Sequence, residues 1–559
     1  TLPEVKVDLQ SGLVIGDPAL SLEQVAGRFN LWREGTVAQV NCLPGERLLF
    51  QLLLPAARPG APAVRSPGPI SVQLFAVGVA RNPDAPEVAV PDVLIPVDSN
   101  GRAGIPLHDP ALFPEQAKWR SYLLEIETAG TKPGDYPLHI RIPGDGSQPE
   151  LELLVHCLDG REPAQLDFWL DLNEYGDKYL KFLKAEKRKL TLKDRLPWDR
   201  VAYRLAHRHR AILNLLPYRS QAGAPRKYFV PRMVNRDSLN PQLDWSEFDR
   251  RFGPYLDGSA FADGQPVRHF YLPFNPDWPA PFRLYQQNRT RYEAIWQAFA
   301  RAFVNHFREK GWTQTIFQVY CNQKPGPNNQ IPWHLDEPKG VKDYQALRYY
   351  GELTHRAFAG AEPVQVRFRV DISHFYCDEH RGSKKKDFRV NGGDRILFPV
   401  VDIWVISDHS LYGEEAARQA ARLRRQGREV WVYGDTPPLQ ESGRLSAWKI
   451  YHAWLQGWNG FMAWKTFADR TDQSRGTNFL LYDLNMPPIR GIFSSLRFKL
   501  LWRALEDIRV AEALTTPPEK SRAVVTHLVG AAERGDWHTL WQFRITHQLP
   551  QSTRLNGAQ

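Results

Sequence analysis

The chain contains 559 residues, and at roughly 100–200 residues per domain this length predicts two or three domains. Hydrophobic residues make up 42% of the chain and charged residues 24%, which is an ordinary balance for a globular protein. The net charge is +10, and the densest basic runs, Lys184–Arg195 and Lys384–Lys386, contain few aromatic residues. We therefore interpret these runs as solvated faces and expect no nucleic-acid partner. No stretch of about 18 apolar residues occurs, so no membrane span is expected.

Aromatic residues are frequent, with 18 Trp, 20 Tyr and 28 Phe. Aromatic rings stack on ligands that have flat apolar faces, but a large α/β barrel also needs bulky core residues, so composition leaves both explanations open. The four cysteines, Cys42, Cys157, Cys321 and Cys377, are too few and too scattered for a disulfide scaffold. Whether Cys42 and Cys157 form a disulfide stays open, and no oligomeric state is predicted.

Residues 1–160 are predicted to form an antiparallel β-sandwich. Apolar runs of strand length, such as Arg47–Leu54, Ile70–Val79 and Tyr122–Ile126, are separated by breaks rich in proline and glycine, notably Pro55–Pro69. Several short strands with loops between them are typical of a sandwich. No long amphipathic helix is predicted in this region.

Residues 161–478 alternate between strand-like and helix-like runs, a pattern typical of βα units. The expected strands are Asp167–Leu172, Ala211–Leu216, Val267–Pro273, Thr315–Tyr320, Val364–Val370, Val401–Ile406, Glu429–Tyr433 and Gly460–Lys465. The clearest helices are Tyr292–Gly311, Lys342–Phe358, Glu414–Gly427 and Ser446–Gly457. Eight strands with intervening helices predict a (β/α)8 TIM barrel. The alternative is an open doubly wound sheet, which is disfavoured because no glycine-rich phosphate-binding turn occurs.

Residues 479–559 are predicted to form a C-terminal strand and helix extension that is mainly helical. A short strand is expected at Phe479–Tyr482. Helices are expected at Leu496–Leu514, which carries an apolar stripe, and at Ser521–Arg534. The chain as a whole is therefore predicted to be a multidomain α/β protein.

The most informative polar motif is Asp336-Glu337-Pro338, which follows the fourth predicted barrel strand. Active sites of such barrels lie at the carboxyl ends of the strands. Of two adjacent carboxyl groups, one can protonate a leaving oxygen while the other performs a second task, and their proximity should raise one of the two pKa values. Pro338 is expected to bias Glu337 toward extended backbone. The structural alternative is that this tripeptide starts a helix.

Further polar and aromatic side chains are expected at the same strand ends. Carboxylates, amides, indoles and phenols together are typical of a sugar-binding site. The candidates for substrate binding are Asp171, Tyr320, Asn322, Trp333, His334, Asp371, His374, Asp402, Trp404, Trp431, Tyr433 and Trp464. Tyr271 and Asp408 also fall at such ends. Each aromatic candidate could instead fill the barrel core.

The segment from His374 to His380 contains metal-binding side chain types, including Cys377 and Glu379. Its spacing matches no common zinc site, so no metal and no cofactor are expected.

Four segments together carry a resemblance to a known family. They are Gly134-Asp135-Tyr136, Asp336-Glu337-Pro338, the strand runs Val401–Trp404, Val430–Tyr433 and Gly460–Trp464, and the helical segment Ser495–Arg509. In their order and spacing the chain resembles glycoside hydrolase family 123, the β-N-acetylgalactosaminidases, and the barrel proteins related to them. The loop Cys321–Pro332 is longer here than in the family pattern.

The resemblance implies a retaining, substrate-assisted hydrolysis of β-linked 2-acetamido sugars. The acetamido oxygen of the substrate would attack the anomeric carbon, so that the enzyme needs no nucleophile of its own. Asp336 would orient and polarise the acetamido group, and Glu337 would act as general acid and then as general base. Tyr433 and Trp431 would contact the acetamido group.

Trp404 and Trp464 would form walls against the sugar. The implied partner is an oligosaccharide or polysaccharide, and degradation of polysaccharide implies a secreted or periplasmic protein. The sequence begins at Thr1 without a signal-like apolar run, so we expect that a targeting segment is missing from it.

Two alternatives stay open. A sugar without an acetamido group would need a carboxylate nucleophile or a water-activating base, drawn from Asp171, Asp371, Asp402 or Asp435. A barrel that binds glycans without cleaving them is the second alternative.

Overall fold

The structure is a computed structural model of the chain. It describes residues 6–549 apart from 12, 18, 33–35, 59, 67, 83–84, 104–105, 145–148, 177–178, 181–182, 185–189, 220–222, 327–329, 377–388, 390–391, 409–412, 435, 437, 469–479, 487–488 and 517. The predictions made for Cys377, Glu379, His380, Lys384–Lys386 and Asp435 therefore lie outside the described residues. No helix in the described part of the chain is long and apolar enough to cross a membrane.

The chain divides into two compact units. The first contains Thr1–Asp167, Thr436–Leu455 and Ala468–Gln559, and the second contains Phe168–Asp435 and Gln456–Phe467. We call the first the sandwich unit and the second the barrel unit. The segment Thr436–Leu455, which separates the seventh and eighth barrel strands in the sequence, belongs to the sandwich unit.

The barrel unit contains eight parallel strands, as the sequence predicts. They are β11 (Trp169–Tyr175), β12 (Ala211–Leu216), β15 (His269–Tyr271), β16 (Ile316–Tyr320), β17 (Gln365–Ile372), β18 (Ile403–Ser407), β19 (Glu429–Gly434) and β20 (Gly460–Trp464). Their order in the sheet is β12-β11-β20-β19-β18-β17-β16-β15. The two end strands, β12 and β15, contain residues whose Cα atoms approach within 8 Å, so the sheet is a nearly closed barrel.

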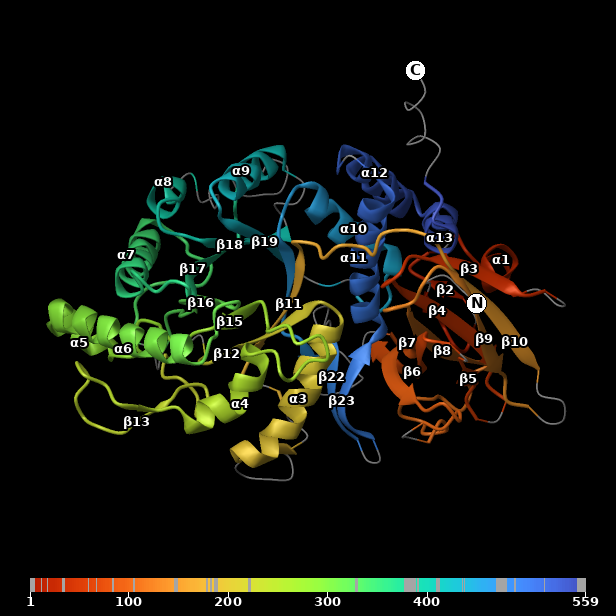
Figure 1. Ribbon diagram of the computed structural model, residues 1–559, viewed down its shortest axis with the longest axis horizontal. Coiled ribbons are helices and arrows are strands. Elements are labelled where there is room, and N and C mark those ends of the chain that lie inside the picture. Colours follow the sequence, from red (N-terminus) through yellow and green to blue (C-terminus); the bar gives the residue numbers. More distant parts are fainter. Residues whose placement is uncertain are drawn as a thin grey trace, which may run out of the picture. The chain divides into compact units, whose positions relative to one another are not determined.

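Helices surround these strands (Figure 1). They are α3 (Leu192–Arg208), α4 (Ser246–Leu256), α5 (Phe282–Gln287), α6 (Arg289–Glu309), α7 (Val341–Ala357), α8 (Gly393–Leu397) and α9 (Glu414–Arg425). The prediction missed α3, whose first turn lies in the basic run Lys184–Arg195. Its start was visible in the sequence, because Thr191 and Asp194 form a capping box. A short antiparallel pair, β13 (Arg232–Met233) and β14 (Leu243–Asp244), lies in the loop after β12.

The sandwich unit contains two main sheets. Six antiparallel strands follow one another in the order β22-β23-β7-β6-β8-β4. Their bounds are β4 (Arg47–Pro55), β6 (Ser71–Asn82), β7 (Ala85–Val97), β8 (Trp119–Glu127), β22 (Leu481–Met486) and β23 (Ile489–Ser495). The C-terminal region thus adds a hairpin to the N-terminal sheet, where the sequence indicated one short strand.

The second sheet has the order β3-β10-β9-β5. Its strands are β3 (Ala38–Cys42), β5 (Ala63–Arg65), β9 (Gly134–Arg141) and β10 (Glu150–Cys157). One pair of strands departs from the predicted antiparallel arrangement, because β3 and β10 pair in parallel. Cys42 and Cys157 are register partners on these two strands, and both are buried free thiols. The unit also contains β1 (Lys6–Val7), β2 (Val14–Ile15) and the short helix α1 (Leu22–Phe29).

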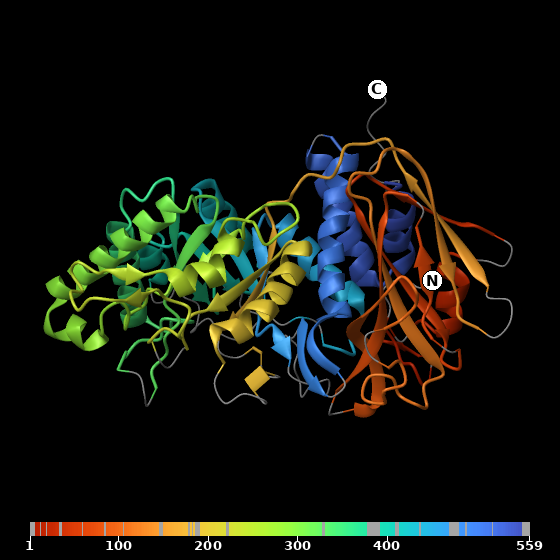
Figure 2. The ribbon, with the colours of Figure 1, turned by 60° about the horizontal axis from the view of Figure 1, so that its bottom comes forward.

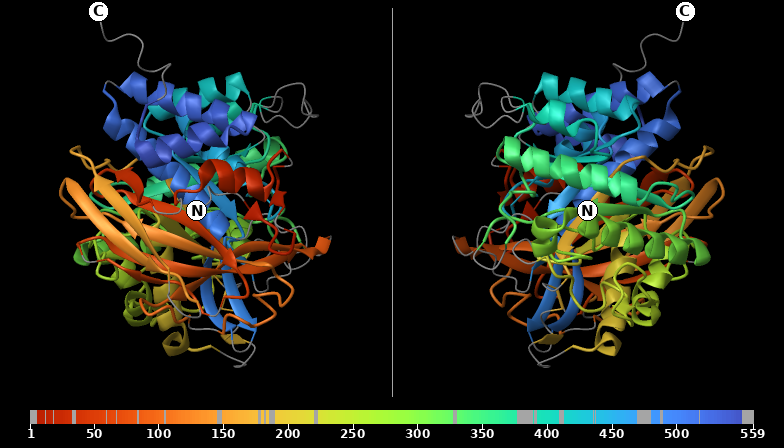
Figure 3. Two further views of the ribbon diagram at one scale, coloured as in Figure 1. Left: turned by 90° about the vertical axis from the view of Figure 1, so that its right-hand side faces the viewer. Right: turned by 90° about the vertical axis from the view of Figure 1, so that its left-hand side faces the viewer.

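Four helices accompany the two sheets. They are α10 (Gly443–Leu455), α11 (Leu496–Leu514), α12 (Pro518–Arg534) and α13 (Trp537–Thr546). Helix α10 packs against α11 and α12, and α13 contacts β3. Figure 2 shows α11 alongside the strands of the first sheet. Figure 3 shows the C-terminal helices beside the N-terminal strands. The sequence predicted the bounds of α11 correctly and missed α13.

Helix α11 is buried on all sides, because every residue from Leu496 to Ala511 is buried. This buried stretch nevertheless carries six charged side chains, and a buried charge is costly unless it is paired. The ion pairs are Arg497 with Asp92, Lys499 with Glu125, Arg503 with Glu46 and Asp507, and Arg509 with Glu506. Asp92 lies on β7 and Glu125 on β8, so the pairs tie the helix to the sheet that it covers.

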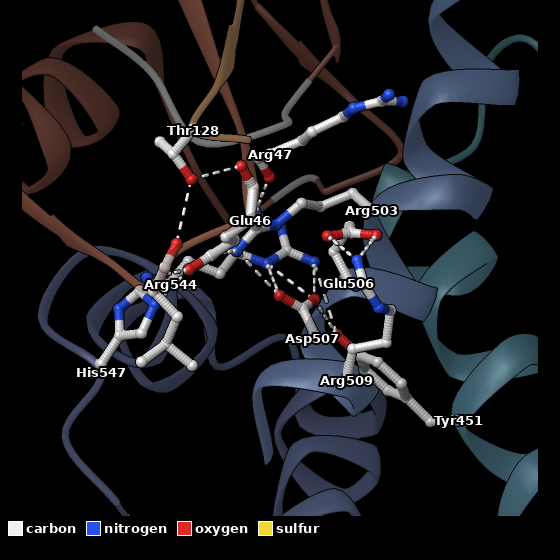
Figure 4. Close-up of polar contacts among 11 residues, drawn as sticks. Glu46, Arg47, Thr128, Tyr451, Arg503, Glu506, Asp507, Arg509, Arg544 and His547 are labelled. Carbon is white, nitrogen blue, oxygen red and sulfur yellow. Dashed lines mark hydrogen bonds and ion pairs between the residues drawn. The ribbon is translucent and has the colours of Figure 1, made fainter. Parts of the chain in front are cut away.

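Asp507 is the centre of the largest of these clusters (Figure 4). Its carboxylate lies 2.7 Å from Arg544 on α13 and 3.1 Å from Arg503 on α11. Glu46 contacts Arg503 from the opposite side and lies 2.6 Å from His547, just after α13. The cluster therefore holds α11, α13 and the start of β4 together.

We predict that Asp507→Asn lowers the free energy of unfolding by about 3 kcal/mol, because it keeps the shape of the side chain and leaves two buried guanidinium groups without their carboxylate. Urea denaturation followed by tryptophan fluorescence measures the loss. Glu519→Gln, at an exposed position of α12, is the control and should have almost no effect. Equal stability of the two variants would contradict the importance of this cluster.

Candidate active site

A cavity of about 320 Å³ opens at the carboxyl ends of five neighbouring strands, β16 to β20. Its lining residues are Lys324, Asp336, Glu337, Asp371, Ser373, His374, Ser407, Asp408, Tyr433, Gly434, Met462 and Trp464. All of them belong to the barrel unit. This is the end of the barrel at which the sequence placed the active site.

Asp336 and Glu337 both line this cavity, and each of their carboxyl groups is held at both oxygens. The Tyr320 hydroxyl lies 2.9 Å from Asp336 Oδ1, and the Tyr433 hydroxyl donates to Glu337 Oε1 at 2.6 Å. The remaining oxygens, Asp336 Oδ2 and Glu337 Oε2, lie 3.0 and 3.1 Å from the same atom, Lys324 Nζ. The two acidic side chains therefore converge on one ammonium group.

The backbone of Glu337 is left-handed, with φ at +53°. The expectation that Pro338 would bias Glu337 toward extended backbone is therefore wrong. A residue other than glycine is uncommon in this region and costs about 1–3 kcal/mol there. The contacts of the side chain with Tyr433 and Lys324 offset this cost, since both depend on where the backbone aims the carboxylate.

Asp336-Glu337-Pro338 does not start a helix. Helix α7 begins at Val341, after the N-cap residue Gly340. The side chain of Asp343, in the first turn of α7, accepts hydrogen bonds from the backbone N–H groups of His334 and Lys339 at 3.1 and 3.0 Å. Asp343 thus fixes both sides of the segment Asp336–Pro338, and the acidic pair is left facing the cavity.

The pKa values of the two carboxyl groups are shifted in opposite directions. Burial raises the pKa of Asp336 to about 6, although the Lys324 ammonium acts against this rise. Burial also acts to raise the pKa of Glu337, but the hydrogen bond from Tyr433 and the charge of Lys324 together bring it below its usual value. One pKa of the pair is raised, as the sequence predicted, but the main cause is the burial of Asp336 rather than its proximity to Glu337.

A buried guanidinium, that of Arg369 on β17, lies beneath the cavity. It bonds Asp371 through two nitrogens at 2.8 and 3.1 Å, and it contacts Asp171 on β11 at 3.3 Å. It also donates to the hydroxyl of Tyr271 and lies 4.6 Å from the ring centre of Tyr320. Burial raises the pKa of Asp171 to about 6, against the attraction of Arg369. One cation thus serves two buried carboxyl groups.

The structure brings most of the predicted acidic and aromatic candidates together. Those that line the cavity are Asp336, Glu337, Asp371, His374, Tyr433 and Trp464. Tyr320 and Asp171 lie directly beneath it, because Tyr320 contacts both Asp336 and Asp371, and Asp171 contacts Arg369. These two residues support the lining rather than form it.

Asp402 and the tryptophans of β18 and β19 were predicted for the site, and the structure places them elsewhere. Asp402 precedes the first residue of β18, at the amino end of the strand, where it bonds His355 at 2.8 Å. Trp404 is fully buried and packs against Phe398 outside the strands, because Ile403 and Val405 take the inward positions of β18. Trp431 is part of the barrel core.

Three candidates near the segment Asp336–Pro338 do not line the cavity. Asn322 is fully buried directly after β16. Trp333 packs edge-on against Phe282 and Tyr285. The backbone N–H of His334 is held by Asp343, as described above. These three residues support the chain around Asp336 and Glu337 or fill space beside it.

Sequence reasoning missed Lys324, Ser373, Ser407, Gly434 and Met462. Lys324 lies in the long loop Cys321–Pro332, and a cation close to an acidic pair was a usable signal. Gly434 is needed for space, because a Cβ atom there would lie 2.3 Å from the Asp408 carboxylate. Among the described residues, no group of three His, Cys, Asp or Glu side chains could hold a metal ion.

The comparisons with known proteins bear on the fold. No protein-family model matches the sequence, and no curated protein matches it. A family 123 glycoside hydrolase from Clostridium perfringens is similar in structure, with a TM-score of 0.55 and 13% identity over 90% of this chain and 94% of that chain. The endo-β-1,4-mannanase from Thermotoga petrophila has a TM-score of 0.37 and 11% identity over 63% of this chain and 79% of that chain. The resemblance to family 123 is thus confirmed for the fold.

We predict that Arg369→Met destabilises the barrel unit in a pH-dependent way. Without the guanidinium the pKa of Asp171 rises further above its unfolded value, so the folded state binds protons more readily than the unfolded state and stability falls as pH rises. The free energy of unfolding should drop by about 3 kcal/mol at pH 8 and by clearly less at pH 5. Urea denaturation at both pH values measures this.

Arg348→Met, on an exposed position of α7, is the matched control and should behave as the wild type at both pH values. A loss for Arg369→Met that is the same at pH 5 and pH 8 would contradict the proposed charge balance.

Proposed function

We propose that this protein is a glycoside hydrolase that cleaves β-linked 2-acetamido sugars by a retaining, substrate-assisted mechanism. The observation that carries the proposal is the adjacent pair Asp336 and Glu337, both lining one cavity at the strand ends of a barrel. The fold that the chain shares with a family 123 hydrolase supports it. Cleavage of a polysaccharide would suit a secreted or periplasmic protein.

The pair supplies the two tasks that this chemistry needs. In the first step the acetamido oxygen of the substrate attacks the anomeric carbon, and Glu337 gives a proton to the departing glycosidic oxygen. In the second step Glu337 takes a proton from the water that opens the cyclic intermediate. Asp336, as a carboxylate, accepts a hydrogen bond from the N–H of the acetamido group and balances the positive charge that develops on that group.

The burial of Asp336 strengthens this second role. The residue is 7% exposed, and a carboxylate in a medium of low dielectric constant interacts more strongly with a developing charge than one in water. The Tyr320 hydroxyl and Lys324 fix its orientation, so little reorganisation is needed during the reaction. Glu337 is half-exposed, as suits a group that exchanges protons with water.

The rest of the lining suits a sugar ring. Trp464 and Met462 provide an apolar wall for C–H faces, and Ser373, Ser407 and Asp408 provide polar groups for hydroxyls. The volume of about 320 Å³ is at the small end of the range for ligand pockets, which suits a single sugar residue.

A second candidate function keeps the barrel and uses a carboxylate nucleophile or base. Of the candidates Asp171, Asp371, Asp402 and Asp435, Asp371 lines the cavity, Asp171 is paired beneath it and Asp402 lies at the opposite strand end. Asp435 lies outside the described residues. Asp371 is therefore the group on which hydrolysis of a sugar without an acetamido group would depend.

We predict that Glu337→Gln and Asp336→Asn each lower kcat/KM on a β-N-acetylgalactosaminide disaccharide by a factor of about 10²–10⁴, the usual contribution of a positioned acid–base group. For Glu337→Gln the loss should be smaller on the 4-nitrophenyl glycoside, whose leaving group needs no proton. Steady-state assays on the two substrates measure this.

The control is Glu352→Gln, on α7 and away from the cavity, which should keep full activity. Activity that survives both site substitutions would overturn the assignment. A thiazoline analogue of the cyclic intermediate separates the two candidate functions: tight inhibition supports substrate assistance, and absence of binding supports the role of Asp371. Glycan binding without turnover, unchanged in Glu337→Gln, would indicate a non-catalytic barrel.

A further inference from the structure

We propose that Lys324 is a positioning residue of this site: its ammonium group holds the carboxyl groups of Asp336 and Glu337 together and determines which of them carries the catalytic proton. The inference rests on the proposed function. It concerns a residue that lies outside the acidic motif, in a loop that is longer here than in the family that the sequence resembles.

The geometry of the contacts is specific. Lys324 Nζ lies 3.0 Å from Asp336 Oδ2 and 3.1 Å from Glu337 Oε2, while the other oxygen of each carboxyl group contacts a tyrosine hydroxyl. Tyr320 therefore serves Asp336, Tyr433 serves Glu337, and Lys324 serves both. A group that bonds both members of an acid–base pair can couple their protonation.

The backbone of the loop brings Lys324 to this position. The carbonyl of Gln323 accepts hydrogen bonds from the N–H groups of Leu335 and Asp336 at 2.9 and 3.4 Å. This pairing joins the two ends of the loop directly beside Lys324, and it sets the lysine opposite the acidic pair. The left-handed backbone of Glu337 completes the arrangement.

The order of the two pKa values is the reverse of what the reaction needs. Asp336 has the raised pKa and Glu337 the lowered one, whereas the mechanism requires an ionised Asp336 and a protonated Glu337. When the pair holds one proton, that proton must therefore leave an oxygen of Asp336 and reach an oxygen of Glu337 as the acetamido group binds. One O–H bond breaks and one forms, and Lys324 remains an ammonium throughout.

Lys324 makes this exchange possible because it stabilises either carboxylate. With one proton on the pair, the two acidic groups and the ammonium are neutral together, and the proton can change position without creating a net buried charge. Other titratable or charged groups face Asp336, Glu337 and Lys324 from the surrounding strands. They are Tyr320, Asp371, His374, Asp408 and Tyr433, with Arg369 beneath.

The test uses Lys324→Met, which removes the charge and keeps much of the stem. Loss of a neighbouring cation raises the pKa values of both Asp336 and Glu337. Both limbs of the pH profile of kcat/KM on the β-N-acetylgalactosaminide disaccharide, whose leaving group needs the proton, should therefore move to higher pH by about one unit or more. Lys324→Arg keeps the cation and should keep both limbs near their wild-type positions.

Lys342→Met, an exposed lysine of α7, is the control for the loss of one positive charge and should leave the profile unchanged. Lys324→Gln is a second variant in case the first does not fold. If activity falls equally at all pH values while the limbs stay in place in both Lys324→Met and Lys324→Gln, Lys324 has only a structural role and the proposal is overturned.

A readout without substrate separates this proposal from the proposed function. A water-soluble carbodiimide modifies protonated carboxyl groups, and peptide mass spectrometry gives the pH midpoint of labelling at Asp336 and Glu337. In Lys324→Met both midpoints should shift to higher pH, and unchanged midpoints would overturn the proposal. If wild-type protein cleaves no 2-acetamido sugar but the midpoints shift, the proposed function fails and the coupling by Lys324 stands.

Discussion

The buried guanidinium of Arg369 is the interaction on which the arrangement of the site depends. It lies on β17 and contacts Asp371 on the same strand, Asp171 on β11 and Tyr271 on β15, so it links side chains from three barrel strands. Because a buried charge is costly unless it is paired, the contacts of Arg369 with these side chains hold the three strands in one relative position. Through Asp371 the network reaches the hydroxyl of Tyr320, and through Tyr320 it reaches Asp336.

The charge balance of the site follows from this network. Four carboxyl groups, those of Asp171, Asp336, Asp371 and Glu337, are served by two permanent cations, Arg369 and Lys324. Burial disfavours the excess negative charge, and the raised pKa values of Asp171 and Asp336 are the result. A proton taken up by the site is therefore held more tightly than on an exposed carboxyl group, which is what acid catalysis of glycoside cleavage requires. In the proposed mechanism, this proton is the one that Lys324 helps to move from Asp336 to Glu337.

The sequence predicted the barrel and the place of the acidic pair, because strand and helix periodicity and the motif Asp336-Glu337-Pro338 are local signals. It failed where the outcome depends on contacts between distant residues. The register of the barrel puts Asp402 before β18 and turns Trp404 outward, and neither is visible in a strand-length apolar run. Glu337 takes a left-handed backbone against the preference that Pro338 imposes, and Lys324 reaches the site only because Gln323 pairs with Leu335 across the loop.

The most direct test of the account is the dependence of hydrolysis on the nucleophilicity of the acetamido group. A series of 4-nitrophenyl glycosides that carry N-acetyl, N-fluoroacetyl, N-difluoroacetyl and N-trifluoroacetyl groups lowers the electron density on the amide oxygen in steps and leaves the leaving group unchanged. If that oxygen is the nucleophile, kcat/KM falls steeply and steadily along the series. A nearly constant kcat/KM would contradict substrate assistance and would assign the nucleophile to the protein.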